Sequence, residues 1–331
     1  MSTLFIDRKG ISCALENGAL VMSEKGERIG VVPTAPLERI IFKTDAAIRT
    51  SDLARLGDKG VGIIFLSGRG AKPVLFLPAQ HHDARRRLSQ YLLSESEEFC
   101  RCFSVQLIRE KIEGQKRHLE DRMKGRAEVD AALSVVLTWM EGILLRLDGA
   151  LTLDALRGLE GSAARHYFKG LSVLADPALG FTGRNRCPPR DPLNAILSLT
   201  YTLLAADAAL SAHRAGLDPY VGLLHKVEFG RCSLACDLIE PFRAEADRFA
   251  LQLFDSGILT PGDFSISASG CLLKKDGRVK FYPRYEEAAH VWRDRLDKRC
   301  LCLASDWVAA CRTGRTDENS SSSPSCEFRE E

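Results

Sequence analysis

The sequence predicts a two-domain α+β protein: a small N-terminal β-sandwich-like domain, then a larger all-α catalytic domain that carries one β-hairpin. Three observations predict this fold. The 331 residues are enough for two hydrophobic cores. Short strand-like segments separated by turn signals fill residues 1–80. From residue 81 onward, the chain changes to long segments with apolar residues three or four positions apart.

The first 80 residues contain segments of strand length, such as ISCALE and ALVMS. These two are joined by Asn17-Gly18, the pair most typical of a two-residue type I′ hairpin loop. Lys25-Gly26 is a further turn signal, and residues 51–56 are expected to form a short helix. We therefore predict two packed sheets, with the domain boundary near residues 79–84.

Residues 81–311 are expected to form helices that pack through their apolar faces. The helical periodicity slips once, at residues 94–98. Asp191 followed by Pro192 is typical of a helix start, and Gly216 is typical of a helix end.

Two further features are predicted near the C-terminus. Apolar and polar residues alternate around Asp276-Gly277, which predicts a β-hairpin with its turn at this pair. Residues 312–331 form a polar, Ser-rich run that carries too little apolar surface to fold, so we expect a disordered tail.

The composition restricts the class of protein. No apolar run approaches the roughly 20 residues of a membrane span, and the start MSTLFIDRKG lacks a secretory signal, so we expect a cytoplasmic protein with no membrane partner. The 11 cysteines are an odd number scattered along the chain, which disfavours a disulfide framework and a structural zinc site. With a net charge of +2, any contact with nucleic acid must be local.

The segment GLLHKVEFGRCSLACDLIEPFR places one histidine and two acids, His225, Asp237 and Glu240, among apolar residues. Ser233 is the expected N-cap of a helix that runs to about residue 254. The two acids then share one helix face, and the helix dipole favours the ionised form of Asp237. Pro241 is expected to kink the helix just after Glu240.

A further acid, Glu160, lies on the apolar face of the helix predicted for LRGLEGSAARHYF. Burying an isolated carboxylate is costly unless a cation accompanies it. Two carboxylates and one imidazole from different helices are suitable ligands for Mg²⁺ or Mn²⁺, and less so for Zn²⁺.

Each of these residues also has a purely structural interpretation. Glu160 could pair with Arg165 or Arg231, and His225 could be a hydrogen-bonded core residue. Asp237 could serve only the helix dipole, and Glu240 could be a surface acid.

In their order and context, three segments resemble the Cas1 family, the integrases of CRISPR adaptation: LEGSAARHYF, RNRCPPRDPLNAILSLTYTLL and GLLHKVEFGRCSLACDLIEPFR. The resemblance covers nearly the whole chain. It implies that Glu160, His225 and Glu240 bind the metal ion. It also implies that Asp237 supports catalysis beside them, and that Asn194 lies near the site.

The resemblance implies a metal-dependent DNA integrase and endonuclease, with Mg²⁺ or Mn²⁺ as cofactor, in the cytoplasm of a prokaryote. It would join the 3′-hydroxyl ends of captured double-stranded DNA fragments to the CRISPR repeat array by phosphoryl transfer. The implied partners are a second copy of the chain, bound through the β domain, and the small protein Cas2, which bridges two dimers. The alternative is a non-catalytic scaffold that captures DNA while a partner supplies the nuclease.

Such a site requires basic residues that follow the DNA backbone. We favour the basic trio that lies between the metal motifs in the sequence, although solvated helix faces carry similar charges. The predicted DNA-binding residues are Arg184, Arg186, Arg190, Asn194, Lys226 and Arg231.

Overall fold

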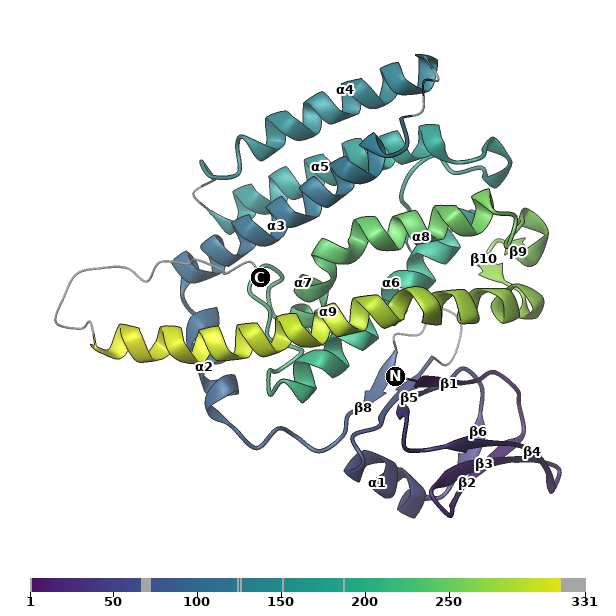
Figure 1. The fold of residues 1–331 in the computed structure, drawn as a ribbon. Helices are drawn as coiled ribbons and strands as arrows, with labels where there is room; N and C mark the ends of the chain where they lie inside the picture. The colour runs from purple at the N-terminus through teal and green to yellow at the C-terminus, as the bar shows by residue number, and fades with distance from the viewer. Residues whose placement is uncertain are drawn as a thin grey trace. The chain divides into compact units, whose positions relative to one another are not determined.

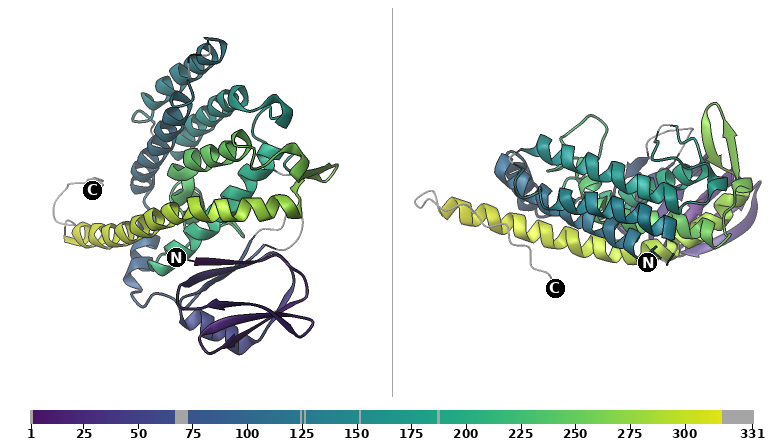
Figure 2. Two further views of the ribbon diagram at one scale, coloured as in Figure 1. Left: turned by 45° about the vertical axis from the view of Figure 1, so that its right-hand side comes forward. Right: turned by 90° about the horizontal axis from the view of Figure 1, so that it is seen from above.

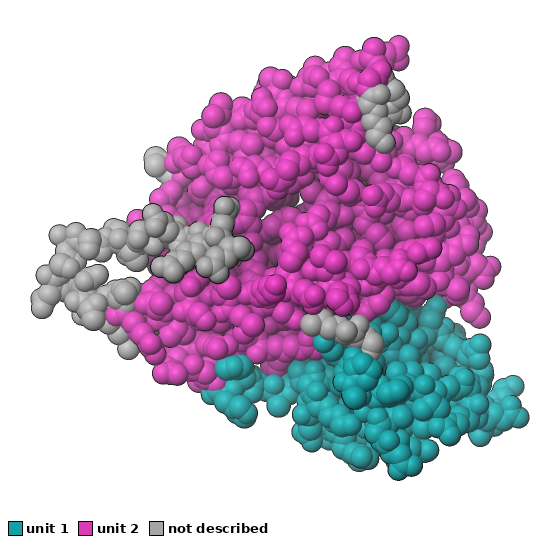
Figure 3. Space-filling view, viewed as in Figure 1, with its two compact units in different colours: residues 1–82 teal, residues 83–331 magenta. Residues whose placement is uncertain are grey.

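The computed structural model describes residues 2–66, 73–123, 125, 127–150, 152–186 and 188–316. The chain forms two compact units, Met1–His82 and Asp83–Glu331, which Figure 3 shows in different colours. The first unit is rich in strands and the second is mostly helical (Figure 1), so the predicted α+β class is confirmed.

In its described residues, the first unit has eight strands and one helix. They are β1 (Ser2–Ile6), β2 (Ile11–Glu16), β3 (Ala19–Glu24), β4 (Glu27–Pro33), β5 (Leu37–Phe42), β6 (Ala46–Ile48), α1 (Thr50–Asp58), β7 (Gly62–Phe65) and β8 (Val74–Phe76). One four-stranded sheet has the order β1-β5-β7-β8, and the other has the order β4-β3-β2-β6.

The hairpin between β2 and β3 is built as the sequence predicts. Asn17 and Gly18 have φ values of 46° and 78°, as a type I′ loop requires. The resulting register pairs Leu15 with Leu20. Both leucines belong to one core cluster with Ile40 of the other sheet, so the two sheets pack against each other.

The second unit consists of helices and one hairpin in its described residues. The helices are α2 (Arg85–Ser94), α3 (Glu97–Glu120), α4 (Ala127–Leu144), α5 (Leu153–Leu174), η1 (Pro177–Leu179), α6 (Pro192–Arg214), α7 (Ser233–Ile239), η2 (Glu240–Phe242), α8 (Arg243–Asp255), η3 (Pro261–Asp263) and α9 (Lys275–Thr316). The hairpin strands are β9 (Phe264–Ser267) and β10 (Gly270–Leu273).

Several helices start at side-chain caps. Ser96 caps α3 by accepting a hydrogen bond from the Phe99 N–H, and the slip in periodicity at residues 94–98 is the break between α2 and α3. Asp191 caps α6 by accepting from the Asn194 N–H, as predicted. Such a cap satisfies a backbone N–H that lacks a partner within the helix.

Helix α6 runs through the middle of the helical unit (Figure 2), and its buried residues lie on all sides. Among the described helices it alone has the length and apolar composition of a membrane span. However, 78% of its most apolar stretch is buried inside the fold, as expected for a core helix. The apolar character of this segment is not obvious in the sequence, because isolated polar residues interrupt its apolar runs.

The predicted C-terminal hairpin exists, but its turn was placed wrongly. Gly270 pairs with Ser267, so the turn lies at residues 268–269, and Asp276 already belongs to α9. The helical spacing of the buried residues Phe281, Tyr285 and Trp292 outweighs the local turn signal.

Helix α9 also changes the prediction for the C-terminus. It continues to Thr316, so residues 312–316 of the predicted disordered tail are helical. The rest of that predicted tail, residues 317–331, lies outside the described residues.

A buried ion pair ties α9 to α6. Arg293 Nε lies 3.0 Å from Asp207 Oδ2, and both side chains are almost completely buried. The Tyr285 hydroxyl donates a second hydrogen bond to Asp207, and Glu286 also contacts the Arg293 guanidinium. These groups satisfy one another inside the core, where an unpaired charge would be costly.

Replacement of Asp207 by Ala is expected to destabilise the chain by about 3 kcal/mol, because it leaves the buried Arg293 with only part of its counter-charge. Urea unfolding followed by circular dichroism measures the change. Glu287→Ala removes an exposed pair with Arg284 and should change the free energy of unfolding by no more than about 0.5 kcal/mol. Equal effects of the two substitutions would contradict a stabilising role for the buried pair of Arg293 and Asp207.

Candidate active site

Two of the predicted acids meet at one cation. Lys111 of α3 places its Nζ 2.7 Å from Glu240 Oε2 of η2, and the same ammonium forms an ion pair with Glu160 Oε1 of α5. The exposed side-chain fractions are 6% for Lys111, 3% for Glu240 and 29% for Glu160. Two carboxylates that are far apart in the sequence therefore converge at a nearly buried point.

Glu240 has a second basic partner. Arg243 Nε donates to Glu240 Oε2 over 2.8 Å. Burial alone would raise the pKa of Glu240, but the charges of Arg243 and Lys111 outweigh it and hold this pKa far below its ordinary value. Burial also opposes the charge of Arg243, yet the Glu240 carboxylate raises the pKa of Arg243 well above normal. The pair is therefore ionised over the whole physiological pH range.

The break at Pro241 directs Glu240 towards α3. The single kinked helix that the sequence predicts is divided here into α7, the short 3₁₀ helix η2 and α8. Pro241 lacks an N–H and cannot continue the α-helical hydrogen bonds. The predicted cap is also corrected, because Cys232 occupies the N-cap position and the Ser233 hydroxyl donates to the Lys226 carbonyl.

Asp237 organises the loop that carries His225. Its carboxylate is completely buried and accepts hydrogen bonds from the N–H groups of Leu223, Leu224 and His225. It also lies 2.6 Å from His225 Nδ1. These contacts, and not the helix dipole that the sequence analysis invoked, satisfy Asp237.

The contact between Asp237 and His225 fixes the imidazole. Because a carboxylate accepts hydrogen bonds, Nδ1 carries the ring hydrogen and Nε2 is left for another partner. A histidine that binds a metal usually has its second nitrogen held in this way.

Two residues hold this loop against the rest of the site. Arg157 donates from Nε and Nη2 to the Leu224 carbonyl, and it lies one turn before Glu160 on α5. Gly222 has no room for a side chain, since a Cβ there would lie 2.8 Å from Asp237 Oδ2 and from the His225 carbonyl oxygen. Helix α5 therefore both presents Glu160 and positions the loop that carries His225.

The donor types fit a hard divalent ion. Carboxylate oxygens and one imidazole nitrogen suit Mg²⁺ or Mn²⁺, and the fold already stabilises a cation between Glu160 and Glu240. Within the described residues, however, no group of three or more His, Cys, Asp or Glu side chains is arranged around a common point. The metal-ligand roles remain predictions.

The partner of Glu160 could not be identified from the sequence. It is Lys111, 49 residues upstream, and neither Arg165 nor Arg231, the two partners that the sequence suggested. Arg231 instead lies 2.5 Å from Glu228. A signal for Lys111 existed in the sequence, because it lies between Ile108 and Ile112 on the apolar face of α3.

Two of the predicted DNA-binding residues, Arg184 and Asn194, have structural roles within the protein. The Arg184 guanidinium donates to Asn194 Oδ1 and to the Ser198 hydroxyl, and burial lowers the pKa of Arg184. Asn194 is fully buried and donates to the Gly183 carbonyl and to Asp191 Oδ2. Both side chains order the loop before α6, and their predicted contacts with DNA are not tested by this structure.

The other DNA-binding candidates stay predictions. Arg186, Arg190 and Lys226 are exposed. Arg231 is half-buried and donates to the Lys226 carbonyl as well as pairing with Glu228. The same loop exposes Phe229 completely, a feature that the sequence analysis did not single out.

A buried polar network lies behind Glu240. The Arg243 guanidinium lies 4.6 Å from the centre of the Tyr201 ring, and the Tyr201 hydroxyl donates to Asp247. Burial raises the pKa of Asp247 to about 6, although the Tyr201 hydrogen bond opposes the shift. His118 Nδ1 lies 2.8 Å from the Tyr167 hydroxyl, and burial lowers the pKa of His118 to about 4.

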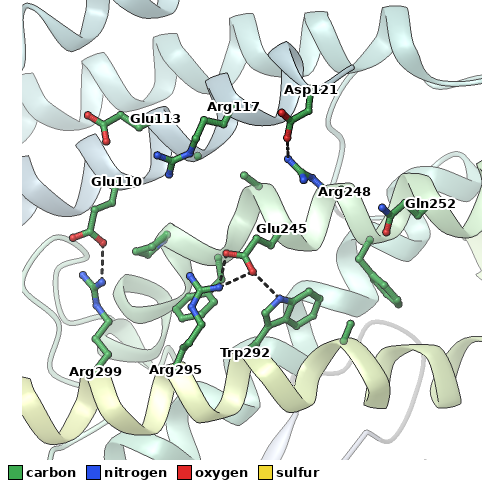
Figure 4. Close-up of a pocket in the computed structure, with 16 residues that line it drawn as sticks. Glu110, Glu113, Arg117, Asp121, Glu245, Arg248, Gln252, Trp292, Arg295 and Arg299 are labelled. Carbon is green, nitrogen blue, oxygen red and sulfur yellow. Dashed lines mark hydrogen bonds and ion pairs between the residues drawn. The ribbon is translucent and has the colours of Figure 1, made fainter. Parts of the chain in front are cut away.

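A cavity of about 810 Å³ lies next to η2, between α3, α8 and α9. Pro241 and Phe242 line it, directly after Glu240 in the chain. Its polar side chains largely pair with one another (Figure 4), as Arg248 does with Asp121 and Arg299 with Glu110.

Comparisons with known proteins agree with the resemblance seen in the sequence. The family model described as CRISPR associated protein Cas1 matches residues 4–287. A CRISPR-associated endonuclease Cas1 from Thermodesulfovibrio yellowstonii is 36% identical over 303 residues, which cover 88% of this chain and 94% of that protein.

Solved structures share the fold. A CAS1 protein from Thermotoga maritima gives a TM-score of 0.81 at 20% identity, covering 93% of this chain and 97% of that one. A chain of a Cas6-RT-Cas1–Cas2 complex gives a TM-score of 0.78 at 20% identity, covering 92% of this chain and 35% of that chain.

Gly222→Ala is expected to destabilise the chain by about 1–3 kcal/mol, because the new Cβ would overlap Asp237 and the His225 carbonyl. Chemical denaturation measures the change. Gly158→Ala is the matched control, since a Cβ there meets nothing within 4 Å and Ala favours the helix by up to about 1 kcal/mol. A Gly222 variant as stable as the wild type would show that the loop is not tightly packed.

His118→Gln is expected to flatten the pH dependence of stability. The folded-state pKa of His118, about 4, is below the ordinary value of 6.5. The contribution of His118 to the free energy of unfolding is therefore fully present above pH 6.5. It is lost as the pH falls towards 4, and the total loss is up to about 3 kcal/mol.

The difference in unfolding free energy between wild type and variant, measured in urea from pH 4 to 7, isolates this contribution. Asp247 has the opposite effect on the pH dependence of stability, because its raised pKa makes its stabilising contribution disappear as the pH rises through about 6. Wild type and variant both contain Asp247, so its effect cancels in the difference. The exposed His290→Gln control should keep the wild-type slope. If the stability of the His118 variant depended on pH as that of the wild type does, the lowered pKa of His118 would be contradicted.

Proposed function

Because the chain belongs to the Cas1 family of CRISPR-associated proteins, we propose that it is a metal-dependent DNA endonuclease and integrase of CRISPR adaptation. It would act on phosphodiester bonds and join the 3′-hydroxyl ends of captured double-stranded DNA to the repeat array. The observation that carries the proposal is the convergence of Glu160 and Glu240 on the buried ammonium of Lys111, while Asp237, three residues before Glu240, holds His225.

The proposed cofactor is Mg²⁺ or Mn²⁺, with Glu160, His225 and Glu240 as its ligands. When bound, such an ion polarises the scissile phosphate and stabilises the negative charge that develops on it.

The chain's own residues prepare this chemistry. Asp237 holds Nδ1 of His225, so Nε2 is the nitrogen offered to the site. Arg243 holds the Glu240 carboxylate in place and keeps it ionised. A 3′-hydroxyl that attacks the bound phosphodiester gives strand transfer, whereas water in the same position gives cleavage.

The proposed assembly is a homodimer formed through the β unit, with Cas2 bridging two dimers on double-stranded DNA. Similarity to a chain of a complex whose name includes both Cas1 and Cas2 supports Cas2 as a partner. We place this assembly in the cytoplasm of a prokaryotic cell.

His225→Ala is expected to reduce strand transfer roughly 100-fold or more, because it removes a ligand outright, whereas loss of a supporting residue such as Asp237 costs 10- to 100-fold. The assay measures joining of a 3′-hydroxyl duplex to a supercoiled repeat plasmid with Mn²⁺ and Cas2 present. His290→Ala is the control, since this exposed histidine on α9 lies outside the site.

Full strand transfer by the His225 variant would reject the proposed mechanism. If cutting and joining then depended only on the partner while the variant still captured DNA, the chain would be the non-catalytic scaffold.

A further inference from the structure

The ammonium of Lys111 occupies the point on which the acids of the site converge. We propose that Lys111 is a built-in counter-ion, which holds the two carboxylates together in the metal-free protein and is displaced when a divalent ion binds. This inference rests on the proposed function and concerns how the site is loaded.

Lys111 and a divalent ion would use the same oxygen atoms. The ammonium contacts Glu160 Oε1 and lies 2.7 Å from Glu240 Oε2. An ion such as Mg²⁺ bound to these carboxylates would lie about 2.0–2.1 Å from their oxygens. Because like charges repel strongly in a poorly solvated site, both cations cannot hold these positions at once.

The local charges favour replacement of the Lys111 ammonium by the divalent ion over binding of the ion beside it. The two carboxylates are already balanced by Lys111 and Arg243. A divalent ion added to this set would leave a nearly buried excess of positive charge, which the fold does not solvate. Departure of the Lys111 ammonium removes part of that excess and frees the two carboxylate oxygens.

Lys111 is the cation that can leave. Within the described residues, its ammonium contacts only the two acids. Its flexible four-carbon stem allows the charge to move while α3 stays in place. Arg243, by contrast, is held between Glu240 and the Tyr201 ring. The partial exposure of Glu160 provides a route from the site to solvent.

The same contacts give Lys111 a structural role before metal binds. It joins α3 to α5 and η2 through the two ion pairs. Without it, Glu160 and Glu240 would face each other with Arg243 as their remaining cation. Removing Lys111 should therefore weaken the metal-free protein and strengthen metal binding, two effects that a purely structural lysine would not combine.

The test measures Mn²⁺ binding to the full-length protein by isothermal titration calorimetry, and thermal unfolding with and without Mn²⁺. For Lys111→Met, the Kd for Mn²⁺ is expected to fall roughly tenfold, which corresponds to about 1.4 kcal/mol of binding free energy. Its Tm should be below that of the wild type without metal, and the difference should shrink at saturating Mn²⁺.

Lys116→Met is the matched control. Lys116 lies on the same helix and pairs with the exposed Glu141, so its loss should change neither the Kd nor the metal-dependent shift in Tm. Unchanged or weaker Mn²⁺ binding by Lys111→Met would overturn the inference.

Two measurements keep the proposal testable if Lys111→Met does not fold. In the wild type, an amine-reactive acetylating reagent should modify Lys111 faster when Mn²⁺ is present, as read by mass spectrometry of the peptides; equal rates would overturn the exchange. Lys111→Arg keeps the charge and should bind Mn²⁺ no more tightly than the wild type, and tighter binding would also overturn it.

A further variant separates this inference from the proposed function. Glu160→Gln should lose most Mn²⁺ binding if the proposed metal site is correct. If this variant binds Mn²⁺ like the wild type, the metal site itself is wrong. If Glu160→Gln loses binding and Lys111→Met gains none, only the counter-ion role fails.

Discussion

The arrangement of the helical unit depends on neutralising one buried carboxylate, that of Glu240. A carboxylate with a 3% exposed side chain is tolerated only with close cationic partners. Lys111 reaches it from α3, and Arg243 reaches it from the start of α8. Arg243 in turn packs on Tyr201 of α6, whose hydroxyl contacts Asp247. The position of one acid thereby fixes how three long helices meet, and Glu160 of α5 joins them through Lys111.

The two acids of the last motif are three residues apart but have different tasks. Asp237 satisfies backbone N–H groups and the imidazole of the loop before it, so its role is to hold a conformation. Among the described residues, the Glu240 carboxylate pairs with the charged side chains of Lys111 and Arg243, so its role is electrostatic. The two side chains can point in different directions because the α-helix that contains Asp237 ends just before Glu240. The 3₁₀ helix η2, which contains Glu240 and Pro241, begins there.

Features that depend on neighbouring residues could be predicted from the sequence. Asn17-Gly18 determines its own turn, and Asp191 caps the helix that follows it. The acids of the site were recognisable because charged groups are unusual on apolar helix faces, and His225 because it lies among apolar residues in the same motif. Lys111 carried the same signal on α3, but its partner could not be predicted, since the pairing with Glu160 depends on how α3 packs against α5. Arg184 shows the same limit: its position between two motifs said nothing about whether its guanidinium points into the protein or out of it. At Asp276-Gly277, the packing of a long helix outweighed a local turn signal.

The site is also assembled from residues that are made at very different times. Lys111 and Glu240 are separated by more than a third of the chain, and α9, the last described helix, is joined to α6 through the buried pair of Arg293 and Asp207. These groups can therefore meet only after the ribosome has made the chain as far as Glu240, and the pair that joins α9 to α6 forms later still. Chains that end before Glu240 would lack one of the two convergent acids, so this cluster of charges can form only after that part of the helical unit has been made.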